Sequence, residues 1–147
     1  MDRSPILLLT VVAGGLIALQ APINSTLGRS VGTFPAASVS FAVGTAALVA
    51  ITLLVGGGFG AIGEARGLSW YYLTGGVLGA IYVTTALVAV RTLGAGGVTA
   101  ATITGQLATA VIIDRLGVLG VPERPLSTQR LIGVALLAAG TFLVVRE

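Results

Sequence analysis

The charged residues of this 147-residue chain are confined to a few short segments. Between them lie five longer intervals without Asp, Glu, Lys or Arg: residues 4–28, 30–63, 67–90, 92–113 and 131–145. A helix needs about 20 mostly apolar residues to cross the ~30 Å hydrocarbon core of a bilayer. Four intervals have that length. The fifth reaches it when extended back through residues 126–129, with Arg130 and Arg146 directing their charged ends toward the headgroups.

Only 9% of the residues are charged, against roughly 25% in an ordinary soluble domain. A membrane β-barrel would alternate apolar and polar residues in segments of about 10, whereas Ala46–Val55 is apolar almost throughout. The first interval is followed by four more and has no clear cleavage site after Ala18, which argues against a removable signal peptide. The sequence therefore predicts an all-α membrane protein, a single domain over 1–147 with about five transmembrane helices.

Glycine and proline positions indicate where these helices begin and end. Gly28 and Gly32 predict the first turn and Pro35 the start of the second helix, and a tight turn is expected at 93–97. The stretch 114–130 is expected to be a surface loop in which Asp114 pairs with its neighbour Arg115. We expect helices at about 5–27, 35–56, 69–91, 97–114 and 128–146. Five arginines then fall on the N-terminal side of the membrane and three on the other, a weak bias toward a cytoplasmic N-terminus that leaves insertion in both orientations open.

The stretch Leu19–Gly28 is the most unusual part of the first helix. Pro22 has no N–H, so the carbonyl of Ala18 loses its helical partner and the helix is expected to kink or break. Such a break is tolerated at membrane depth where it faces protein or water, and interrupted helices are typical of transporters. Gln20 and Asn24 flank the proline, four residues apart on one face. We interpret Pro22 and Gly28 as a hinge beside a polar path; a kink that merely fits the bundle is the alternative.

Other polar side chains lie within the expected spans, where their burial is costly. Thr102 and Gln106 belong to a stripe on the fourth helix that also includes Thr99 and Thr109, and Tyr82 lies on the third helix. Most serine and threonine hydroxyls can bond to their own helix. The amides of Gln20, Asn24 and Gln106 cannot do so as readily, and they line a cavity or join helices.

Several function classes lack the necessary residues. The chain contains neither histidine nor cysteine, so the usual metal-hydrolysis and serine–histidine chemistries lack their ligands and bases. No acidic residue or lysine lies deep in a span, so the usual proton-carrying carboxylate is missing. We predict no enzyme, no metal, no cofactor and no nucleic-acid partner.

Three segments carry a resemblance to a known family: QAPINSTLGRSVG at 20–32, SVSFAVGT at 38–45, and the long segment from Gly105 to Val144 that begins GQLATAVIIDRLG. Together and in this order they resemble the YdcZ-like family of small five-helix members of the drug/metabolite transporter superfamily. The third helix and its preceding loop match only in hydropathy. The resemblance implies half of a ten-helix inverted-repeat transporter, located in the bacterial inner membrane. It also implies pairing with a second copy, or a homologous five-helix chain, in the opposite orientation.

From these features we predict a small-solute transporter, an exporter that acts as an antiparallel dimer by alternating access. Its cavity would be lined by the first, third and fourth helices, with five side chains in contact with a small-molecule substrate: Gln20, Asn24, Tyr82, Thr102 and Gln106. Two other functions remain open. A non-transporting membrane scaffold or assembly partner would use the amides to join helices, and a passive channel would need a continuous polar path.

Overall fold

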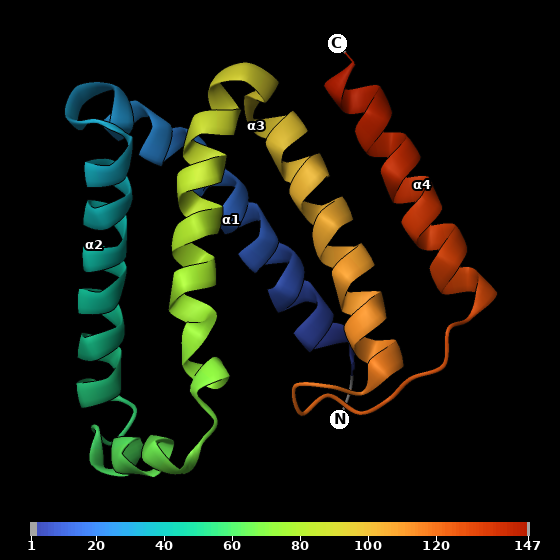
Figure 1. The fold of residues 1–147 in the computed structure, drawn as a ribbon. Helices are drawn as coiled ribbons and strands as arrows, with labels where there is room; N and C mark the ends of the chain where they lie inside the picture. The colour runs from blue at the N-terminus through green and yellow to red at the C-terminus, as the bar shows by residue number, and fades with distance from the viewer. Residues whose placement is uncertain (1–2, 147) are drawn as a thin grey trace. The chain divides into compact units, whose positions relative to one another are not determined.

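The computed structural model describes residues 3–146, apart from the side chain of Arg3, and within that range it contains helices but no strands (Figure 1). The elements in chain order are α1 (Arg3–Val31), α2 (Thr33–Leu54), the 3₁₀ helices η1 (Gly60–Gly67) and η2 (Trp70–Thr74), α3 (Gly75–Leu116) and α4 (Thr128–Val145). The all-α prediction is confirmed.

Four helical segments are long and apolar enough to cross a membrane: Ser4–Val31, Thr33–Leu54, Trp70–Leu116 and Thr128–Val145. The 42 residues of α3 would extend about 63 Å as one straight helix, roughly twice the ~30 Å hydrocarbon core. However, α3 consists of two helices that meet at Gly94, where φ is 67° and ψ is 172°. The break lies inside the turn predicted at 93–97, so the chain has five helical crossings, as expected.

The first turn is shorter than the sequence suggested. α1 continues to Val31, and Gly32 alone, with φ of 94°, separates it from α2. Gly28 therefore lies inside α1 and does not mark the turn. Pro35 is the third residue of α2, in the first turn, where a missing N–H costs no intrahelical hydrogen bond. α1 also continues through Pro22, which lies inside the helix, so the predicted break in secondary structure at this residue is not present.

The residues group into two compact units. Unit 1 contains residues 1–18 and 92–147, and unit 2 contains residues 19–91. No separate linker joins them, because α1 and α3 each contribute to both units. In unit 2, α2 and the part of α3 before Thr92 are connected through η1 and η2 (green in Figure 1).

Small side chains dominate the buried positions of unit 2. Its buried apolar residues are Ala21, Ala36, Ala37, Val83, Ala86 and Leu87. Large apolar side chains such as Leu8 and Leu54 remain exposed. Lipid provides no hydrophobic force between helices, so membrane helices associate through small residues that permit close approach. Within the spans, exposed leucines, isoleucines and valines are therefore expected to contact lipid or a partner helix.

Candidate functional site

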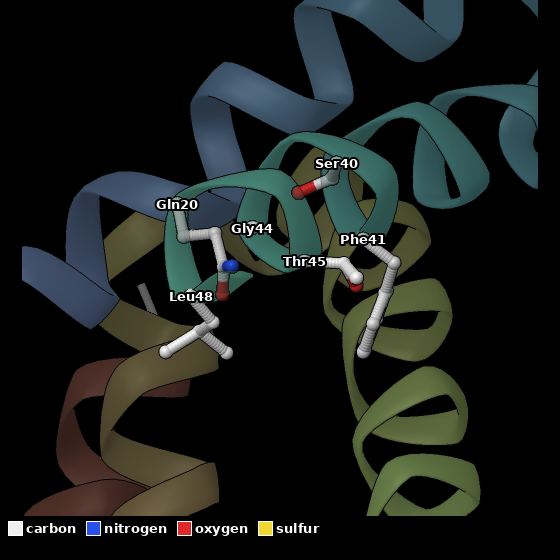
Figure 2. Close-up of a pocket in the computed structure, with 6 residues that line it drawn as sticks. All are labelled: Gln20, Ser40, Phe41, Gly44, Thr45 and Leu48. Carbon is white, nitrogen blue, oxygen red and sulfur yellow. The ribbon is translucent and has the colours of Figure 1, made fainter. Parts of the chain in front are cut away.

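A shallow groove in unit 2 combines polar and aromatic groups. It is lined by Gln20 of α1 and by five residues on one face of α2: Ser40, Phe41, Gly44, Thr45 and Leu48. Figure 2 shows the amide of Gln20 next to this face of α2. The groove encloses about 190 Å³, less than the roughly 300–1,000 Å³ of typical ligand pockets. It offers neutral hydrogen-bonding groups beside a phenyl ring, and it is large enough to hold part of a small solute.

The α2 side of this groove was not anticipated, because the predicted cavity used the first, third and fourth helices. Ser40, Gly44 and Leu48 recur every four residues on α2, with Phe41 and Thr45 beside them, and a Cβ added to Gly44 would meet no neighbouring heavy atom within 4 Å. The spacing of these positions shows in the sequence that they share a face. That this face lies beside Gln20 is a tertiary contact.

Next to Gln20, a stripe along the same α1 segment is buried. Ala21, Asn24, Ser25 and Gly28 are spaced by three, one and three residues, and all four are buried. A Cβ added to Gly28 would lie 3.0 Å from Leu87 Cδ2 and 3.0 Å from Arg91 Nη2. Gly28 therefore lets α3 approach α1 more closely than any larger residue would allow.

Two polar side chains lie within this buried stripe. Ser25, 4% exposed, accepts a hydrogen bond of 3.2 Å from Arg91 Nε. Asn24 is 5% exposed, and its Nδ2 has no hydrogen-bond acceptor among the described residues. A buried amide N–H without an acceptor is costly. The buried stripe thus contains an N–H donor that needs an acceptor.

The five predicted substrate-contacting residues belong to different units. Gln20, Asn24 and the half-buried Tyr82 are in unit 2, whereas the half-buried Thr102 and the exposed Gln106 are in unit 1. Within unit 2, Gln20 lines the groove and Asn24 lies in the buried stripe, so these two residues take part in different surroundings. Their common role in substrate binding stays a prediction.

In unit 1 the closest polar contact between helices involves a pair that the sequence analysis missed. Thr104 of α3 and Thr141 of α4 have their Oγ1 atoms 2.6 Å apart, and Thr141 Oγ1 donates to the carbonyl of Ala100 at 3.0 Å. Thr104 is two positions from Thr102, about 200° around the helix. It therefore falls outside the predicted stripe. Both residue types were visible in the sequence, but nothing in it indicated that they meet.

The loop of unit 1 also corrects a predicted ion pair. Asp114 Oδ2 pairs with Arg130 Nη1 at 3.0 Å, and Arg115 pairs with Glu123 instead of with Asp114. The backbone N–H of Arg124 donates to the carbonyl of Asp114 at 2.7 Å. Arg130 was expected to extend toward the headgroups, but it closes the loop between α3 and α4. Adjacent residues on a helix point in directions about 100° apart, which explains why Asp114 and Arg115 select different partners.

Five apolar helical segments, small buried side chains and polar groups within the spans define a multi-pass membrane protein. Residues 5–143 match the family described as "Putative inner membrane exporter, YdcZ". The match covers nearly the whole chain, so the chain belongs to this family, and the resemblance drawn from its sequence motifs is confirmed. It is a multi-pass protein of the inner membrane. Comparisons with curated proteins and with solved structures gave no match.

Proposed function

We propose that the chain exports a small solute by alternating access, as a dimer of two copies inserted in opposite orientations. The observation that carries the proposal is where the chain passes between its two compact units. It does so twice, between Ala18 and Leu19 and between Arg91 and Thr92. Each passage lies beside an interruption of regular helical bonding. Two units that change their relative position through such segments are what alternating access requires.

The first interruption is at Ala18. Its carbonyl would accept from the N–H of residue 22, and residue 22 is a proline within α1, so that bond cannot form. The second is at Gly94, whose φ of 67° and ψ of 172° belong to a region that is essentially restricted to glycine. Pro22 and Gly94 therefore act as hinges. In this proposal Gly28 does not move as a hinge but holds α1 to α3 within unit 2.

The odd number of crossings supports an antiparallel pair. A chain with five crossings has its ends on opposite sides of the membrane, and two copies in opposite orientations reproduce the ten-helix inverted-repeat arrangement that the family resemblance implies. The arginine bias of five against three is weak enough to permit both insertions. The residues proposed to contact solute remain Gln20, Asn24, Tyr82, Thr102 and Gln106.

Accessibility of single cysteines tests the proposed path, and the chain has no native cysteine to interfere. Cysteines at positions 20, 24 and 106 should react with a water-soluble thiol reagent in membrane vesicles. Leu8→Cys is the matched control in α1, because its side chain is 66% exposed in the isolated chain but should face lipid and remain unreactive. Silence at all three test positions would contradict a water-lined path and favour amides that join helices.

Measuring solute flux and folding in the same variants distinguishes a transporter from a scaffold. Asn24→Leu and Gln106→Leu should fold normally and abolish solute efflux from vesicles, because each loses its hydrogen bond to solute. Thr10→Val is the control, since the Thr10 hydroxyl bonds only to the Ile6 carbonyl of its own helix. Reduced dimerisation with unchanged flux would point instead to an assembly function. A cysteine added at the C-terminus should be labelled from both sides of the membrane; labelling from one side alone would exclude the antiparallel pair.

A further inference from the structure

Arg91 is a cation without a carboxylate partner among residues 3–146. The two ion pairs of that range join Arg115 to Glu123 and Arg130 to Asp114. Within that range the Arg91 side chain donates one hydrogen bond, from its Nε to Ser25 Oγ, 3.2 Å long. An arginine carries five N–H donors in a fixed planar fork. The Nη edge of this guanidinium is thus left for another acceptor.

The position of the guanidinium is defined by α1. Ser25 holds its Nε, and Arg91 Nη2 lies 3.0 Å from the point that a Cβ on Gly28 would occupy. The planar group therefore lies along one turn of α1, directly over the glycine. Ser25 is 4% exposed and Arg91 is exposed, so the hydrogen bond that orients the arginine is partly buried while the guanidinium remains accessible. A freely snorkelling arginine would have no such fixed acceptor.

A second donor on the same turn also lacks an acceptor. Asn24 is adjacent to Ser25 in the buried stripe, and its Nδ2 has no hydrogen-bond partner in residues 3–146. The fully buried polar atom of this stripe that lacks a partner in that range is thus an N–H donor. The missing component is therefore an acceptor, and the cation beside it favours an acceptor with negative charge.

The charges of unit 2 agree with this conclusion. Its charged residues are three arginines, Arg29, Arg66 and Arg91, and one acid, Glu64. Glu64 lies in η1, which follows the C-terminal end of α2, whereas Arg29 is in the last turn of α1, just before α2 begins. Within unit 2 the α1–α2 turn and η1 lie at opposite ends of α2 (Figure 1). The acid is therefore too far along the unit to neutralise Arg91.

We propose that Arg91, oriented by Ser25 over Gly28, binds an oxyanion and that Asn24 donates a second hydrogen bond to it. The transported solute therefore carries a carboxylate or phosphate group. This assignment of substrate class rests on the proposed export function. The groove next to Gln20, with neutral hydroxyls and the Phe41 ring, would suit an uncharged part of a solute. A lipid phosphate offers the same chemistry as a soluble anion, so the test separates the two sources.

The test uses the whole protein in a neutral maltoside detergent, which contains no phosphate. Phenylglyoxal modifies exposed arginines, and mass spectrometry of peptides gives the modification rate at Arg91 and, as the internal control, at Arg29. Benzoate and inorganic phosphate are the soluble anions tested, and chloride is the control for ionic strength. Phosphatidylglycerol added to the micelles tests whether a lipid phosphate binds instead. Benzoate or phosphate should protect Arg91 about tenfold at saturation and leave Arg29 unprotected.

Variants identify the donors. Asn24→Leu should raise the anion concentration that gives half-maximal protection of Arg91 about tenfold, because it removes a hydrogen bond to a charged acceptor. Ser25→Ala should raise it about fivefold, because the fork is no longer oriented. Thr26→Val is the control on the same turn, since the Thr26 hydroxyl bonds to the carbonyl of Pro22. It should not change the protection.

Each result has a defined consequence. No protection by either free anion overturns the inference, and protection by phosphatidylglycerol alone makes Arg91 a lipid contact and overturns the substrate class. Equal protection of Arg91 in the wild type and in Asn24→Leu would show that Asn24 does not bind the anion. Because binding is measured without transport, solute flux in vesicles with no protection would refute this inference alone. Protection with no flux of any solute would support the anion site and contradict the export proposal.

Discussion

Replacing Gly28 with alanine tests the close approach of α1 and α3 within unit 2. The new Cβ would lie 3.0 Å from Leu87 Cδ2 and 3.0 Å from Arg91 Nη2, whereas nonbonded carbon atoms prefer about 3.5–4.0 Å. The end of Arg91 can move aside. Leu87 is 0% exposed, so it is enclosed by its neighbours and moves less easily. The substitution therefore forces an overlap of at least half an ångström onto a buried side chain, or separates the helices.

The expected magnitude combines two opposing effects. Overpacking of a well-packed site costs about 1–3 kcal/mol, and alanine is favoured over glycine in a helix interior by about 0.8–1 kcal/mol. Gly15→Ala in α1 is the matched control, since a Cβ there meets no heavy atom within 4 Å and only the helix-propensity gain applies. The free energy of unfolding of Gly28→Ala should thus be about 1–3 kcal/mol below that of Gly15→Ala.

Reversible unfolding in mixed micelles with increasing mole fraction of dodecyl sulfate, followed by far-ultraviolet circular dichroism, measures both variants under the same conditions. A difference smaller than about 0.5 kcal/mol, the usual error of additivity, would refute the close approach at Gly28. It would also weaken the position assigned to the Arg91 guanidinium, because the same glycine makes room for both.

Two further substitutions test unit 1 by the same unfolding measurement. Thr141→Val removes the contacts to Thr104 and to the Ala100 carbonyl and should lower the free energy of unfolding by about 0.5–2 kcal/mol. A double-mutant cycle with Thr104→Val should show coupling between the two substitutions. Additive effects would mean that the hydroxyls do not interact. Gly94→Ala places a Cβ at φ of 67° and should cost about 1–3 kcal/mol. Gly96→Ala, where the nearest atom to an added Cβ is Val144 Cγ1 at 3.9 Å, should not be destabilising, and equal effects at the two glycines would argue against a strained backbone at Gly94.

The sequence was most informative where the cause of the structure is local. Charge-free intervals of membrane length predicted five crossings, and the structure has five helical segments. Gly32 and Gly94 have positive φ values of 94° and 67°, and both lie in or at predicted turns. These features depend on hydropathy and on backbone conformation, which each short segment determines for itself.

Tertiary structure decided which polar and small residues meet. Thr104, which lies outside the predicted stripe, bonds to Thr141, and Asp114 pairs with Arg130 and not with Arg115. These choices depend on the rotation of each helix about its axis. A shift of one residue turns a side chain by about 100°, and no local property of the sequence fixes that rotation.

The segment Leu19–Gly28 shows both what the local sequence determines and what the tertiary structure decides. The sequence by itself determined that an amide, a proline and a second amide interrupt an apolar helix, and therefore that this segment is costly to place in lipid. Only the tertiary structure placed Gln20 beside α2 and buried Asn24 and Ser25, with Arg91 bonded to Ser25 over Gly28. The physical reason is that the cost of a polar group depends on its own chemistry, whereas the group that satisfies it lies more than sixty residues away in the chain.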